Sequence, residues 1–302
     1  MDKFLCFVAA TLFLISCQSS ETNVAKAENA LVENDTVVSK VQEELKLLSY
    51  WKDFDFNNIE LVKSPQIGER KFVDFLDALS SVSDSVAIEA IRAHLRLAEV
   101  NKDGFDYYIG QYEHYLYDPN SSTRNELYYQ PVLEYLINSP ATDNAQRIRH
   151  QMILKLVSQN NTGEKANDFS FIDTKNQSRT LENEASEYKI LFFYDPTCTT
   201  CAGKITDLGN SKAANDLITV GKLKILAISL HPDRKLWVDD QSSIPTNWLN
   251  GFDNKGQVIG KGLYNILAYP TIYLLDRENK VLTKDAPLDV TLRTLFKLAS
   301  EN

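Results

Sequence analysis

The pattern of apolar and polar positions changes several times along the chain. Residues 4–15 form one continuous apolar run, whereas residues 18–40 are mostly polar and contain no aromatic side chain. From residue 41 to about residue 160, apolar residues recur at intervals of three and four, which is the spacing of an amphipathic helix. No alternating strand pattern appears there. This part of the chain is predicted to be an all-α domain over residues 41–160.

Short and almost continuously apolar runs replace the helical spacing after residue 163. Between them lie segments with helical spacing, so strands and helices alternate. Strands that are apolar on both faces belong to a central sheet that helices cover on both sides. The pattern predicts a separate α/β domain over residues 163–302. The predicted strands are residues 169–173, 189–194, 223–230 and 271–275, and the predicted helices are residues 202–218, 233–240 and 288–300.

Length and composition agree with two globular domains. The chain has 302 residues, of which 43% are hydrophobic and 24% are charged. This balance allows a buried core and excludes low-complexity disorder for most of the chain. The net charge of −9 and the lack of a basic block argue against nucleic acid as a partner.

The N-terminal residues are typical of a signal peptide. Lys3 precedes the apolar run, which is shorter than the ~20 residues that a membrane-spanning helix needs. The run ends in Leu14-Ile15-Ser16-Cys17, which resembles the lipobox of bacterial lipoproteins. That resemblance implies a signal peptide over residues 1–16, lipidation of Cys17 and a polar tether over residues 17–40. An ordinary secretory signal and a first helix with a chance cysteine are the alternatives.

Once Cys6 and Cys17 are assigned to the N-terminal segment, Cys198 and Cys201 are the cysteines that remain. In an oxidising compartment such a close pair is a structural disulfide or a redox centre. Cys198 follows a predicted strand and precedes a predicted helix, whose amide groups favour the thiolate form. Cys201, one turn further on, is placed to attack a mixed disulfide on Cys198. A zinc site needs four ligands, and no second pair has the required spacing, so no metal is predicted.

Three segments, which include Phe169, the cysteine pair and Tyr269-Pro270, resemble the thioredoxin superfamily, in particular the TlpA/ResA-like envelope thiol-disulfide oxidoreductases. The resemblance implies a thioredoxin-like fold for residues 163–302. It also implies that Pro270 is preceded by a cis peptide bond and faces the disulfide, and that the backbone of Tyr269 pairs with an extended substrate. The N-terminal half resembles an uncharacterised helical domain of such lipoproteins. The three segments are residues 163–169, 192–201 and 268–273.

The chain departs from the family pattern at several positions. Thr197 replaces the tryptophan before the first cysteine, Phe192 stands where thioredoxin has a buried acid, and Lys204 occupies the position of a family glutamate. Asp195 is the nearest acid that remains. It is a candidate proton relay for Cys201 or, alternatively, a residue that shapes the turn before Pro196.

These observations predict a lipid-anchored envelope enzyme that reduces protein disulfides through Cys198 and Cys201. Its partners would be protein thiols and disulfides and a membrane electron donor, and it would need no cofactor beyond its own disulfide. The absence of aspartate at position 18 implies, by the lipoprotein resemblance, the outer membrane facing the periplasm.

Two alternative functions stay open. A peroxiredoxin needs proline and Ser/Thr where this chain has Leu191 and Asp195. A non-enzymatic binding module would use the helical domain, in which eight of the 14 tyrosines fall between Tyr107 and Tyr135. Tyr108 and Tyr112, one turn apart, are predicted to pack in a core rather than to bind a partner.

Overall fold

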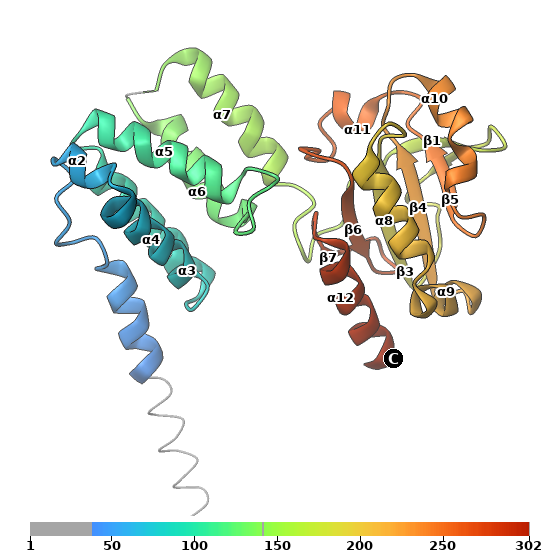
Figure 1. Ribbon diagram of the computed structural model, residues 1–302, viewed down its shortest axis with the longest axis horizontal. Helices are drawn as coiled ribbons and strands as arrows, with labels where there is room; N and C mark the ends of the chain where they lie inside the picture. Colours follow the sequence, from blue (N-terminus) through green and yellow to red (C-terminus); the bar gives the residue numbers. More distant parts are fainter. Residues whose placement is uncertain (1–37, 141, 302) are drawn as a thin grey trace, which may run out of the picture. The chain divides into compact units, whose positions relative to one another are not determined.

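The computed structural model describes residues 38–301 apart from residue 141. The predicted signal peptide, Cys17 and nearly all of the predicted tether therefore lie outside the described residues. The chain divides into two compact units, one that ends at Leu97 and one from Ala98 to Asn302. Figure 1 shows helices only in the N-terminal part and strands with helices in the C-terminal part.

The described part of the first unit is helical. Its core forms around Trp51 and the α3 side chains Phe72, Phe75 and Leu79, which recur at helical spacing and are buried. No described helix is both long and apolar enough to span a membrane. The helical segments are residues 38–48, α2 (Ile59–Val62), a π-helical turn (Pro65–Glu69), α3 (Arg70–Leu79) and α4 (Asp84–Ala98).

Three further helices open the second unit: α5 (Lys102–Leu116), α6 (Glu126–Asn138) and α7 (Asn144–Val157). Asp143 caps α7 by accepting from the backbone N–H of Gln146, whose side chain in turn accepts from the backbone N–H of Asp143. Such a capping box satisfies backbone donors that the helix itself leaves open. Tyr108 and Tyr112 are fully buried on α5, which confirms the prediction that they pack in a core.

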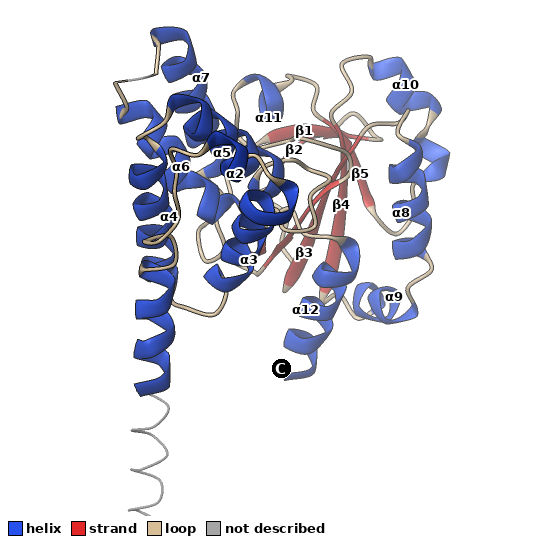
Figure 2. Cartoon of the chain, turned by 60° about the vertical axis from the view of Figure 1, so that its left-hand side comes forward, coloured by secondary structure: helices blue, strands red, loops and turns tan. Residues whose placement is uncertain are grey.

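The remainder of the second unit is built on one seven-stranded mixed sheet, drawn in red in Figure 2. The strand order is β2-β1-β5-β4-β3-β6-β7. β4 is parallel to β3 and to β5, whereas the other pairs are antiparallel. The strands are β1 (Ser170–Asp173), β2 (Ser178–Thr180), β3 (Tyr188–Tyr194), β4 (Leu223–Ser229), β5 (Leu249–Phe252), β6 (Thr271–Leu275) and β7 (Val281–Thr283).

All seven residues of β3 are buried, because both faces of the sheet are covered. Successive side chains of a strand point to opposite faces. Accordingly, Ile190 and Phe192 belong to a core with residues of α8, α10 and α12, whereas Leu191 and Phe193 belong to a second core with residues of α11. The α/β fold with an all-α N-terminal part is as predicted from the sequence. These helices are α8 (Thr199–Gly209), α10 (Arg234–Asp239), α11 (Gln257–Gly260) and α12 (Leu288–Glu301).

The structure corrects one predicted helix and adds three strands. Residues 202–218 were expected to form one helix, but α8 ends at Gly209 and α9 (Lys212–Thr219) begins after Ser211. The Ser211 hydroxyl accepts from the backbone N–H of Ala214 and so caps a new helix. The strands β2, β5 and β7 were not predicted, because runs of three or four residues carry little periodicity.

The change from helices to strands falls between Val157 and Ser170, close to the predicted domain limit near residue 160. The limit between the two compact units lies elsewhere, between Leu97 and Ala98. The helices α5–α7 therefore belong to the same unit as the sheet. The predicted domain limits, 41–160 and 163–302, stay predictions.

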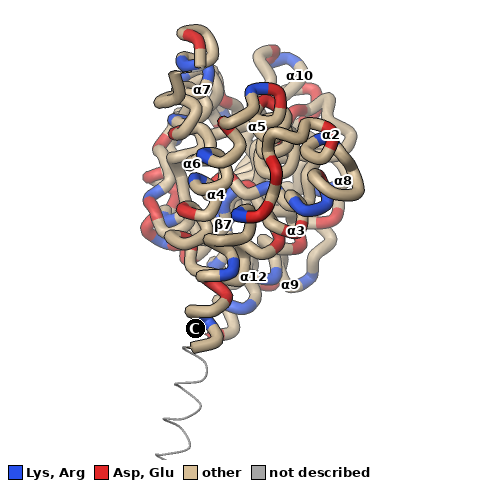
Figure 3. The backbone as a smooth tube through the Cα atoms, turned by 90° about the vertical axis from the view of Figure 1, so that its left-hand side faces the viewer, with Lys and Arg blue, Asp and Glu red and all other residues tan. Residues whose placement is uncertain are grey.

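Lys and Arg are interspersed with Asp and Glu along the described backbone (Figure 3). Several opposite charges form exposed pairs one helical turn apart, such as Lys212 with Asp216 at 2.7 Å and Arg293 with Asp289 at 2.8 Å. Exposed pairs of this kind contribute little to stability because water screens them.

Candidate active site

Cys198 lies where β3 gives way to α8. It is the N-cap residue of α8, with an extended backbone (φ −83°, ψ 110°), and is partly exposed. Its Sγ accepts a hydrogen bond from the backbone N–H of Cys201 at 3.1 Å. The sulfur thus occupies the position at which an N-cap side chain meets the open amides and positive end of a helix dipole.

A loop that is distant in sequence lies on another side of the same sulfur. The Cys198 thiol donates to the backbone carbonyl of Tyr269, with an Sγ–O distance of 3.6 Å. The Tyr269–Pro270 peptide bond is cis, as the resemblance implied. The structure therefore brings together three of the predicted site residues, Cys198, Tyr269 and Pro270.

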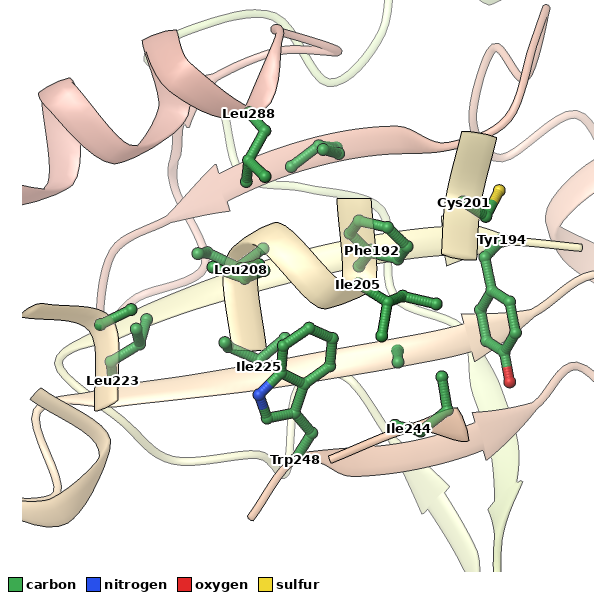
Figure 4. Close-up of a cluster of buried hydrophobic side chains, with 14 of the residues drawn as sticks. Phe192, Tyr194, Cys201, Ile205, Leu208, Leu223, Ile225, Ile244, Trp248 and Leu288 are labelled. Carbon is green, nitrogen blue, oxygen red and sulfur yellow. The ribbon is translucent and has the colours of Figure 1, made fainter. Parts of the chain in front are cut away.

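Cys201 is buried, with 1% of its surface exposed, and both cysteines are free thiols. It belongs to the core of α8 and the sheet, where Figure 4 shows it at one end of the cluster next to Tyr194. Burial raises the pKa of the Cys201 thiol well above its ordinary value, and the hydrogen bond to Cys198 raises it further. Cys201 is therefore a protonated thiol at neutral pH.

Asp195 forms the contacts of a turn residue. Its Oδ1 accepts from the backbone N–H of Thr197 at 2.8 Å and from the Thr197 hydroxyl at 2.6 Å, while its carbonyl accepts from the N–H of Cys198 at 3.0 Å. These bonds set the path of the chain from β3 into α8. The alternative role of Asp195, as a proton relay for Cys201, stays a prediction.

The side chain of Tyr269 is part of the site, although the resemblance implied a role only for its backbone. Burial, followed by the charge of Asp195 and the two cysteines, raises the pKa of Tyr269 to about 12. Its phenol is consequently neutral at pH 7. Position 269, directly before the proline, is the sequence signal that points to this residue.

Two departures from the family pattern can be placed in the structure. Phe192, at the position of the thioredoxin acid, is fully buried, and Lys204 lies 3.5 Å from Asp207 on the first turns of α8. Asn250 bonds to two side chains of the same core and is a polar group that no pattern in the sequence indicated. Its Oδ1 accepts from Trp237 Nε1 at 2.8 Å and from the Tyr194 hydroxyl at 3.3 Å.

Among the described residues, no three His, Cys, Asp or Glu side chains come together in a way that would hold a metal ion. The chemistry available at this site is that of the two thiols. One is partly exposed and close to amide donors, and the other is buried behind it.

These different surroundings predict the order in which the thiols react. With iodoacetamide at pH 7, Cys198 should alkylate at least about 10-fold faster than Cys201, because only a thiolate reacts and Cys201 is both buried and protonated. Peptide mass spectrometry of the reduced protein would measure both rates, and labelling in urea should make them similar. Faster labelling of Cys201 in the folded protein would overturn the assigned roles.

A dithiol at the start of the helix that follows an inner strand, opposite a cis-proline loop, defines a thioredoxin-like α/β protein. A solved structure of a thioredoxin-like protein from Bacteroides caccae superposes with a TM-score of 0.80 at 32% identity, over 85% of this chain and 93% of that one. The chain belongs to the family of thioredoxin-like proteins.

The remaining comparisons concern one half of the chain each. Residues 18–160 match a family described as a domain of unknown function, DUF5106. The C-terminal domain of an uncharacterised protein from Bacteroides fragilis is 34% identical over 45% of this chain and 98% of its own, with a TM-score of 0.44. A domain of a possible thiol-disulfide isomerase from Cytophaga hutchinsonii is 26% identical over 47% and 97%, with a TM-score of 0.39. No curated protein matches the chain.

Proposed function

We propose that this protein is a thiol-disulfide oxidoreductase of the cell envelope that reduces disulfide bonds in protein substrates. The observation that carries the proposal is the arrangement of the two sulfurs. Cys198 Sγ is partly exposed and accepts an amide hydrogen bond at 3.1 Å, whereas the Cys201 thiol is buried behind it. Cys198 is then the attacking thiolate, and Cys201 is the resolving thiol.

The reaction transfers two electrons from the Cys198 thiolate and the Cys201 thiol to the substrate, whose two sulfurs take up the proton of Cys201 and one proton from water. The Cys198 thiolate attacks one sulfur of the substrate disulfide, forms a mixed disulfide and releases the other sulfur as a thiolate. Cys201 then loses its proton and attacks Cys198 Sγ, which releases the second substrate thiolate. The products are a substrate dithiol and a Cys198–Cys201 disulfide. The raised pKa of Cys201 keeps it protonated until the mixed disulfide has formed.

Tyr269 and Pro270 form the docking edge in this proposal. The carbonyl of Tyr269 lies 3.6 Å from Cys198 Sγ, so a polypeptide paired with the Tyr269 backbone would lie against the attacking sulfur. Backbone pairing of this kind aligns a peptide whatever its side chains are.

The reductive direction requires a donor that returns two electrons to the Cys198–Cys201 disulfide. By resemblance to the envelope enzymes, that donor would be a membrane electron donor. The lipid on Cys17 would keep the protein at the membrane, because each buried methylene contributes about 0.8 kcal/mol to anchoring. The location proposed is the outer membrane, facing the periplasm.

The anchor gives a separate prediction. In cells extracted with Triton X-114, the wild-type protein should enter the detergent phase, and a Cys17→Ala variant should lose the mature lipidated form. Blotting of the two phases measures this, with the outer-membrane fraction tested in parallel. Recovery of both proteins in the aqueous phase would contradict lipid anchoring without affecting the redox proposal.

Catalysed reduction of insulin tests the activity. With dithiothreitol as the electron donor, the full mature chain should reduce insulin at least about 10-fold faster than dithiothreitol alone, because the Cys198 thiolate attacks the disulfides first. Pretreatment of the reduced chain with iodoacetamide should return the rate to that of dithiothreitol. A chain that never exceeds this background would overturn the proposed function.

A further inference from the structure

A helix of the uncharacterised half is bonded to the segment that leads to Tyr269. Asn265 Nδ2 donates to Glu126 Oε1 at 2.6 Å. Glu126 is the first residue of α6, and Asn265 lies four positions before Tyr269, between α11 and β6. Both belong to the second unit; Asn265 is buried, with 2% of its surface exposed, and the Glu126 side chain is 9% exposed.

Charged side chains surround this bond and balance one another. Arg124 contacts Glu126 Oε1 at 2.7 Å, and Lys284 contacts Glu126 Oε2 at 2.9 Å. Arg124 also reaches Asp285 at 2.5 Å. Two cations thus meet two carboxylates, each with less than a fifth of its side chain exposed. Loss of one partner would leave buried charge uncompensated, so the cluster favours one arrangement of the segments that it joins.

The linker after α7 adds bonds to the same segments. Lys284 Nζ donates to the carbonyls of Val157 and Gln159, both at 2.8 Å. Gln159 Nε2 donates to the carbonyl of Gly262 at 2.6 Å, and Asn160 Nδ2 to that of Leu263 at 2.7 Å. The bonded residues therefore lie on both sides of the β6–β7 hairpin in sequence, at 262–265 and at 284–285.

The loop between these anchors and β6 has no regular structure of its own. Residues 266–270 form neither helix nor strand and are partly or fully exposed. Ile266 and Tyr269 pack against the two cores of the sheet, so the path of the loop depends on these contacts and on the residues at its two ends. Asn265 holds one end, and Thr271, the first residue of β6, holds the other, with its Oγ1 donating to the carbonyl of Ala268 at 2.8 Å.

We infer that Arg124, Glu126, Asn265, Lys284 and Asp285, here termed the α6 clamp, position the loop that docks protein substrates. The clamp holds the start of residues 266–270 so that the Tyr269 carbonyl stays beside Cys198. Asn265 and Glu126 are positioning residues, because they act through the loop and touch neither sulfur nor substrate. The inference rests on the proposed function and assigns the helical half a part in substrate recognition.

Loss of the α6 clamp should weaken the reaction with polypeptide substrates more than the reaction with small disulfides. A polypeptide needs an aligned backbone edge at Tyr269, whereas a small disulfide needs only access to Cys198 Sγ. A loosened loop must be ordered again each time a polypeptide binds, which raises KM. The thiol chemistry at Cys198 stays as it was.

The experiment compares the full mature chain with its Asn265→Ala variant. The KM for insulin should rise about 5- to 10-fold with kcat within about twofold, and the rate with 5,5′-dithiobis(2-nitrobenzoic acid) should stay within about twofold. Hydrogen exchange of residues 266–269 should accelerate about 10-fold, while that of β3 and α8 stays unchanged. Lys165→Ala is the matched control, since it breaks an exposed ion pair with Glu182 of 2.7 Å in the same unit.

Glu126→Gln serves as a second variant in case Asn265→Ala does not fold, because it keeps an oxygen acceptor but removes the charge. The same direction of change is expected. The inference would be overturned by equal losses with insulin and the small disulfide, by unchanged exchange at residues 266–269, or by faster exchange throughout β3. Absence of insulin reduction by the wild-type chain would count against the proposed function, and hydrogen exchange would still test the clamp.

Discussion

Replacement of either cysteine by serine is expected to return insulin reduction to within about twofold of the dithiothreitol background, a fall of about 10-fold or more, because one chain needs both sulfurs to deliver two electrons. The two variants should differ in what accumulates. Cys201→Ser keeps the partly exposed sulfur of Cys198, which still attacks a substrate disulfide, but the variant has no second thiol of its own to release it. Cys198→Ser has only the buried sulfur of Cys201, which is 1% exposed.

Mixed disulfides separate the two variants. After incubation with an envelope extract and quenching with acid, Cys201→Ser should appear in reducible high-mass bands, and mass spectrometry of these bands would identify the substrates. Cys198→Ser should give none, and it serves as the matched control. Trapping by Cys198→Ser, or residual turnover of either variant close to that of the wild type, would contradict the assigned order of attack.

Acid is expected to destabilise the first unit through His94. This side chain is fully buried against the rings of Trp51, Phe56, Phe72 and Phe75, with its ring centroid 4.4 Å from that of Trp51. Burial lowers the pKa of His94 to about 3. The folded protein therefore keeps a neutral imidazole under conditions in which the unfolded chain binds a proton.

The sign of the pH dependence of unfolding follows from this difference in proton binding between the folded and unfolded states. Above pH 6.5 His94 is neutral in both, so it adds no pH dependence. Between pH 6.5 and about 3 only the unfolded state gains a proton, and the free energy of unfolding falls by about 1.4 kcal/mol per pH unit. From pH 7 to pH 5 the expected loss from His94 is about 2 kcal/mol.

Urea denaturation at pH 7 and pH 5, followed by circular dichroism, would measure this loss. His94→Phe should remove about 2 kcal/mol of the pH dependence, whereas His114→Phe, at an exposed histidine of α5, should leave it unchanged. The same pH dependence in wild type and His94→Phe would show that His94 is not the group that titrates.

Local signals in the sequence were sufficient for several parts of this protein. Apolar runs such as residues 189–194 indicate a strand buried on both faces, because consecutive residues of such a strand are all buried. The position of Cys198 at the start of a helix was also predictable, since an apolar run ends four residues before it and helical spacing follows. The segments around Pro270 indicated that this residue belongs near the cysteines, through resemblance rather than periodicity.

Other features depend on residues that meet only after folding. The burial of Cys201, which raises its pKa, comes from strands and helices packed over it from many parts of the chain. The bond between Glu126 and Asn265 joins positions 139 residues apart, and neither residue carries a local pattern that names its partner. The grouping of α5–α7 with the sheet likewise depends on contacts between segments far apart in the chain. Periodicity and capping report on neighbours within a few positions, so the sequence by itself determined the longer strands and most helices and singled out the two cysteines. Only the tertiary structure decided which thiol is buried and which distant side chains hold the loop beside Cys198, because these depend on contacts between segments far apart in the chain.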